Sequence, residues 1–191
     1  ILYNLADALL SSLSTPFLLN TGFSQTDIGA IRGGMGLFAT IFGTLAGGSI
    51  VSKLGINRSL WIFAALQALS NLSYFAIAVA GKNYPLLVLG INVENFCGGI
   101  VSAGFVAYLM SLCNQRYSAT QYALLTSFMA FSRDILVSPS GFLQKATGWP
   151  VFFLITIAAA IPAFILLPVV APWNAETAPM PRPGLDDRID E

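Results

Sequence analysis

Six long apolar stretches alternate with short polar breaks along the chain. They cover approximately residues 1–20, 26–51, 59–80, 85–113, 120–144 and 149–171. A helix needs roughly 20 apolar residues to cross the hydrocarbon core of a bilayer. The pattern therefore predicts an all-α membrane protein in which residues 1–171 form a bundle of six transmembrane helices. Residues 172–191 are rich in proline and acidic residues, and we expect them to be a disordered cytoplasmic tail.

The first and last three stretches share landmarks in the same order. Ser24 and Ser118 each begin a capping box before an apolar stretch, "SQTD" and "SATQ", which ties down N–H groups at a helix start. Gly55 and Gly148 then occupy matching breaks. A copy with an odd number of spans must insert upside down relative to the other. We therefore predict two inverted three-helix repeats, as in many secondary transporters.

Loop charge predicts the orientation of the bundle, because Lys and Arg are enriched in cytoplasmic loops. With the N-terminus inside, Lys53, Arg58, Arg116 and two arginines of the tail lie on the cytoplasmic side. Only Lys82 and Lys145 then lie outside. We expect both ends of this segment to be cytoplasmic.

Polar side chains recur at helical spacing inside the spans. A charge in a membrane costs ~3 kcal/mol or more and usually faces the bundle interior or a wet cavity. We expect Asp7, Glu94 and Arg133 to border such a cavity. The Ser and Thr residues are expected mainly to join helices. The other candidates for the cavity wall are Asn4, Gln67, Asn71, Asn95 and Asp134. Pairing of Asp134 with its neighbour stays open, because adjacent helix positions diverge by about 100°.

The second span carries a strip of small residues on one face, formed by Gly36, Thr40, Gly43 and Gly47. Small residues let two helix backbones approach closely. We expect tight packing there. A sliding contact in a transporter would use the same strip.

Composition narrows the classes of function. Hydrophobic residues make up 55% of the chain and charged residues 9%, with zero net charge and no histidine; soluble domains carry about a quarter charged residues. Nucleic-acid binding is not expected. Without histidine the commonest metal ligand and general base are missing, and we predict no metal, no cofactor and no catalytic residues. A membrane enzyme would need clustered reactive groups that these spans lack.

One loop resembles the inter-helix signature of the major facilitator superfamily. In "GSIVSKLGINRSL" the matching positions are Gly48, Lys53, Gly55 and Arg58. Ser52 stands where that superfamily usually has Asp, which puts a charge-relay gate at this loop in doubt.

A narrower resemblance runs over nearly the whole chain up to about Pro168. The segments "ENFCGG", "FVAYLMSLCN" and "SATQYALL" resemble the AmpG-type muropeptide permeases, as does "GMGLFATIFGTLAGG" followed by "LQALSNLSYF". The eukaryotic acetyl-CoA transporters look like more distant relatives. Departures are Asp134 and Ser138, where uncharged or glycine positions are expected, and Arg32, where Asn beside a Lys is expected.

The resemblance implies the C-terminal six-helix half of a twelve-helix permease. Because the chain begins at Ile1, we expect an excerpt of a longer protein whose N-terminal half is a partner. The family implies import of anhydro-muropeptides, cell-wall sugar–peptide fragments, across the inner membrane of a Gram-negative bacterium, driven by protons. The superfamily fold implies that the first and fourth spans line the cavity.

The first and fourth of these spans carry Asp7 and Glu94, so we expect one of the two carboxylates to couple transport to protons. The asparagine and glutamine side chains would bind sugar hydroxyls and peptide amides, and Arg133 would meet a substrate carboxylate. Alternatives are a transporter of another substrate, such as an acyl-CoA or a sugar, and a non-transporting sensor or assembly subunit.

Overall fold

The computed structural model describes residues 2–114, 117–159, 161, 165 and 168, with side chains from residue 7 onward. This part of the chain is helical, and no strand occurs in it. The helices are α1 (Leu2–Asn20), α2 (Gln25–Ile31), the π-helix η1 (Arg32–Gly36), α3 (Leu37–Leu54), α4 (Ile56–Ala80), α5 (Tyr84–Leu112), α6 (Ser118–Val137), α7 (Ser140–Thr147) and α8 (Trp149–Ala158).

Three helical segments are long and apolar enough to cross a membrane. They are Gln25–Leu54, which joins α2, η1 and α3 in one run of 30 residues, Ile56–Ala80 with 25 residues, and Tyr84–Leu112 with 29. The predicted first stretch forms α1. Much of the predicted sixth stretch, and the whole predicted tail at 172–191, lie outside the described residues.

The predicted fifth stretch is not one helix. It separates into α6 and α7 at Ser138 and Pro139. Proline has no N–H to donate, and inside a helix its ring clashes with the carbonyl of the residue four positions earlier. Apolar residues lie on both sides of the short segment 138–141, and their combined length predicted a single span.

The two predicted capping boxes have different outcomes. The Ser24 hydroxyl accepts a hydrogen bond from the Asp27 N–H at 3.0 Å, so the first box is confirmed. The second is wrong, because Ser118 is already helical and Tyr117 flanks the helix without a side-chain cap. Gln121 instead accepts a hydrogen bond from the backbone N–H of Asn114 at 2.7 Å.

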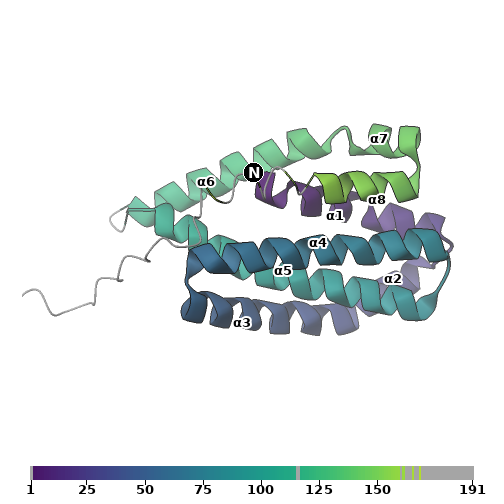
Figure 1. Cartoon of the computed structure of the whole chain (residues 1–191), viewed down its shortest axis with the longest axis horizontal. Helices are drawn as coiled ribbons and strands as arrows, with labels where there is room; N and C mark the ends of the chain where they lie inside the picture. Colours follow the sequence, from purple (N-terminus) through teal and green to yellow (C-terminus); the bar gives the residue numbers. More distant parts are fainter. Residues whose placement is uncertain (1, 115–116, 160, 162–164, 166–167, 169–191) are drawn as a thin grey trace, which may run out of the picture.

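The helices form two layers in Figure 1. One contains α3, α4 and α5; the other contains α1, α6, α7 and α8. Within the first layer α5 packs against both α3 and α4, and α8 joins the layers by packing against α4 and α1. A buried aromatic cluster lies where the layers meet: the rings of Phe17 and Phe153 are 4.7 Å apart, and Tyr74 packs beside them.

Glycines set the contact between α3 and α5. A Cβ on Gly47 would lie 2.7 Å from the carbonyl oxygen of Ile100, and one on Gly99 would lie 2.5 Å from that of Thr40. Gly43 abuts the backbone of Phe96 in the same way. The tight packing predicted for the small-residue strip is confirmed.

Large apolar side chains cover the outer surface. On α3 they include Phe38, Phe42 and Leu45, and on α6 Phe128 and Phe131, all more than 60% exposed. Apolar exposure on this scale marks a membrane or protein contact surface.

Candidate cavity site

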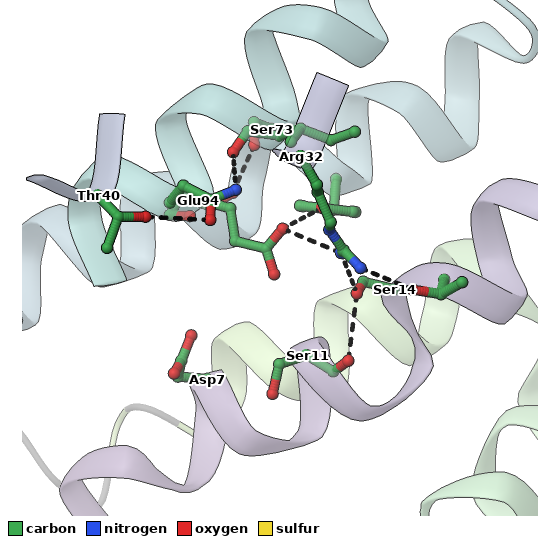
Figure 2. A network of polar contacts seen from close by, with 12 residues as sticks. Asp7, Ser11, Ser14, Arg32, Thr40, Ser73 and Glu94 are labelled. Atoms are coloured by element: carbon green, nitrogen blue, oxygen red, sulfur yellow. Dashed lines mark hydrogen bonds and ion pairs between the residues drawn. The ribbon is translucent and has the colours of Figure 1, made fainter. Parts of the chain in front are cut away.

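A cavity of about 460 Å³ lies among α1, η1, α3 and α5. Its lining residues are Asp7, Ser11, Ser14, Arg32, Thr40, Glu94, Asn95, Gly98, Gly99, Val101, Ser102, Phe105 and Val106. Figure 2 shows Asp7, Ser11 and Ser14 along one side of α1, facing Glu94 and Arg32. Both predicted carboxylates therefore border one space, together with a cation.

Glu94 on α5 has two partners from other helices. Its Oε2 lies 3.5 Å from Nη2 of Arg32 and also accepts a hydrogen bond from the Tyr74 hydroxyl. The side chain is only 12% exposed. A buried carboxylate needs a counter-charge or hydrogen-bond donors to remain ionised, and Arg32 and Tyr74 supply both.

Arg32 also ties η1 to α1. Its guanidinium donates to the hydroxyls of Thr15 and Ser14, each at 2.7 Å. Arg32 is the first residue of the π-helix, and π-turns inside α-helices are frequent at functional sites. One side chain thus joins α1, η1 and α5.

Arg32 was not among the residues predicted for the site. In the sequence it stood out only as a departure from the family pattern. The available signal was the charge itself, since an arginine within an apolar stretch needs a partner.

Asp7 on α1 is held by α4. Gln67 donates its Nε2 to Asp7 Oδ1 at 2.7 Å. Asn4, the other candidate on this helix, has a side chain outside the described residues.

Asn95 lies in the cavity wall beside Glu94. Its Nδ2 donates to the Ile91 carbonyl at 2.7 Å, and its Oδ1 accepts from the Thr40 hydroxyl at 3.2 Å. These bonds fix the side-chain amide at the contact between α3 and α5, with its oxygen atom toward α3.

Gln67 and Asn71 lie behind the cavity wall rather than in it. Gln67 is 6% exposed and Asn71 is fully buried, and neither is among the lining residues. The sequence placed them correctly on one face of α4 with Tyr74, but that face packs into the bundle.

Arg133 and Asp134 on α6 are exposed and are not among the lining residues of this cavity. Arg133 nevertheless reaches α1, where its Nη2 lies 3.4 Å from the hydroxyl oxygen of Ser11. Because Ser11 lines the cavity, Arg133 stands at its edge.

The loop signature forms the turn between α3 and α4. Gly55 joins the two helices with φ of 78°, a conformation that favours glycine. Lys53 lies in the last turn of α3 and Arg58 in the first turn of α4. A Cβ on Gly48 would meet open space.

Known proteins resemble the chain over most of its length. It is 41% identical over 168 residues to the anhydromuropeptide permease of Escherichia coli strain K12, covering 87% of this chain and 34% of that protein. It is 35% identical over 167 residues to AmpG 1 of Rickettsia prowazekii, covering 87% of this chain and 38% of that protein. AmpG 4 of Rickettsia felis is 34% identical over 167 residues.

The chain spans about a third of the length of the curated relatives it matches. No protein-family model matches it. The apolar helices and these relatives together indicate a segment of a multi-pass membrane protein. Over 87% of its length, this chain is a homologue of the anhydromuropeptide permeases and the AmpG proteins.

Proposed function

We propose that the chain is part of a proton-coupled secondary transporter that imports anhydro-muropeptides across the bacterial inner membrane. The observation that carries this proposal is the 41% identity over 168 residues to an anhydromuropeptide permease. The protein's remaining length, including a second six-helix half, lies outside this chain.

The proposed architecture is six spans in two inverted three-helix repeats, the half of a major facilitator transporter, with both ends cytoplasmic. Two turns support the repeat. Gly55 and Gly148 each end one helix and begin the next, with φ of 78° and 77°. Each also donates its N–H to the carbonyl four residues earlier, at Val51 and Gln144.

The cavity suits a polar ligand with a carboxylate. Its volume of about 460 Å³ lies within the ~300–1,000 Å³ range of small-molecule sites. Asn95, Ser11 and Ser102 would bind sugar hydroxyls and peptide amides. Arg32, which lies in the wall, would pair with the substrate carboxylate. Arg133 would assist from the edge.

Proton coupling would act through the Arg32–Glu94 pair. When Glu94 takes up a proton, its charge is neutralised and Arg32 is released to pair with the substrate. When the substrate leaves, Arg32 pairs again with the carboxylate and the proton is lost. Asp7 is the second candidate for this role, and rocking of one six-helix half against the other would alternate access.

Uptake of radiolabelled anhydro-muropeptide into membrane vesicles tests the proposal in the full-length protein that carries this chain. We expect uptake to follow an imposed proton gradient and to collapse with a proton ionophore. Glu94→Gln should keep the protein folded but remove the gradient dependence. The control is Asp27→Asn, a partly exposed acid outside the cavity. Ionophore-insensitive uptake would contradict the proposed function. A Glu94→Gln protein that still responds to the gradient would contradict coupling through the Arg32–Glu94 pair and leave Asp7 as the coupling group.

A further inference from the structure

One face of α4 runs from one carboxylate to the other. Gln67, Ser70, Asn71 and Tyr74 follow at intervals of three and four residues, which places them on the same side of the helix. At one end Gln67 donates to Asp7, and at the other Tyr74 donates to Glu94. The two ends are about 10 Å apart along the helix axis, at 1.5 Å per residue.

The middle of this face is buried and polar. Ser70 and Asn71 are fully buried, and Gln67 is 6% exposed. Four of their atoms have no hydrogen-bond partner in the part of the chain that the structure describes: Gln67 Oε1, Ser70 Oγ, and both Asn71 Oδ1 and Nδ2. Buried polar groups in proteins are almost always paired, and an unpaired one is destabilising.

Water fits these groups better than the other ligands. Two amides and a hydroxyl offer both donors and acceptors, which is the set that holds a buried water through two to four hydrogen bonds. Ca²⁺ takes six to eight oxygen ligands and Mg²⁺ is usually held through carboxylates, whereas this cluster offers three oxygens and no carboxylate. A sugar or peptide is too large to reach atoms that are buried behind the cavity wall.

We propose that ordered water molecules bind among Gln67, Ser70 and Asn71 and link Asp7 to Glu94 as a proton path along α4. The two carboxylates line the substrate cavity, and the waters between them lie behind its wall. The water site stands on the burial of these atoms alone. Its use as a proton path rests on the proposed function.

The transfer moves one proton and leaves the path unchanged. The acid form of Asp7 gives its proton to the first water, and each hydrogen bond in the chain shifts by one. Tyr74 receives a proton from the last water as it gives its hydroxyl proton to the Glu94 carboxylate. Asp7 ends as the carboxylate and Glu94 as the acid.

The charged and titratable groups around the path come from five elements. They are Asp7 from α1, Arg32 from η1, Tyr74 from α4, Glu94 from α5, and Arg133 from α6 through Ser11. Arg32 contacts the Glu94 end and Arg133 reaches α1 at the Asp7 end. Each end thus has a carboxylate with a cation near it.

Radiolytic labelling in isotope-labelled water, applied to the full-length protein, detects buried residues that contact bound water. We expect Tyr74 to be labelled several-fold more than Phe63. Both rings are fully buried and lie on α4, but Phe63 packs against Gly104. If Tyr74 is labelled no more than Phe63, the proposed water site is wrong.

Variants distinguish these waters from water in the cavity. Ser70→Ala should reduce Tyr74 labelling and lower the melting temperature, because a water loses a partner. The matched control is Ser73→Ala, whose hydroxyl donates to the Ser70 carbonyl, and labelling should not change. If Ser70→Ala raises the melting temperature and leaves labelling unchanged, the site is dry and the proposal fails.

The proton path has its own readout. Asn71→Leu keeps the side-chain shape without polar atoms, and gradient-driven uptake in vesicles should fall several-fold while substrate exchange without a gradient is retained. If the Asn71→Leu protein shows gradient-driven uptake equal to wild type, the proposed proton path is wrong. Labelling and melting do not depend on transport, so failure of the proposed function leaves the water result intact.

Discussion

Arg32 and Glu94 lie 62 positions apart in the chain and meet with 3.5 Å between Nη2 and Oε2. The pair joins η1 to α5 at the wall of the cavity. The Arg32 side chain is 32% exposed, whereas the Glu94 side chain is only 12% exposed. The carboxylate is therefore the partner that depends more on the contact.

Removing one partner should destabilise the helix bundle. We expect Arg32→Gln to lower the free energy of unfolding by about 1–3 kcal/mol, between the values for exposed and buried ion pairs. The double variant Arg32→Gln with Glu94→Gln should recover part of that loss, because no unpaired charge is left. Unfolding in detergent measures the two single variants, Arg32→Gln and Glu94→Gln, and the double variant. Additive losses would show that the two side chains are not coupled.

Tyr74→Phe should separate the hydrogen bond to Glu94 from the packing of the ring. The ring stays among Phe17 and Phe153, while the hydroxyl donor to a carboxylate is lost at a cost of about 1.5–3 kcal/mol. We expect a lower melting temperature and a shifted pH profile of uptake. Tyr84→Phe is the control, since that phenol donates to Asp27, which lies outside the cavity. It should leave the uptake profile unchanged.

Neighbouring glycines on α3 should differ sharply in their tolerance of a methyl group. Gly47→Ala places a Cβ against Ile100, and we expect a loss of about 1–3 kcal/mol from overpacking. At Gly48 the same change meets open space and should stabilise the helix by about 0.5–1 kcal/mol. Unfolding of the two variants side by side measures the contrast. Equal effects would mean that α3 and α5 are not in close contact at Gly47.

The two predicted caps provide a paired test at the helix starts. Ser24→Ala removes the acceptor for the Asp27 N–H and should cost about 1 kcal/mol. Ser118→Ala removes no such bond and should change the melting temperature little. A large loss at Ser118 would indicate that it caps α6 after all.

Local patterns predicted much of the helical structure, because they depend on spacing within one segment. Apolar length located α1, α4 and α5 closely, and the small residues on α3 indicated its close contact. The same reasoning failed at Pro139, where apolar residues lie on both sides of a break in the helix. It also failed at Ser118, because the chain before α6 turns through Asn114 and Tyr117.

The polar stripes located the carboxylates but not their partners. Helical spacing placed Gln67, Asn71 and Tyr74 on one face of α4. Whether that face lined a cavity or packed into the bundle depended on the positions of α1 and α5. The role of Arg32 depended equally on Glu94, which lies three helices later in the chain, in α5.

By itself, then, the order of residues determined which segments are helical and which of their faces are polar or closely packed, since helix period and side-chain size act over a few positions. Only the tertiary structure decided that Arg32 pairs with Glu94 and that Asn71 is buried behind the cavity. Those outcomes depend on how separate helices lie against one another, and contacts between distant segments leave no period in a single chain.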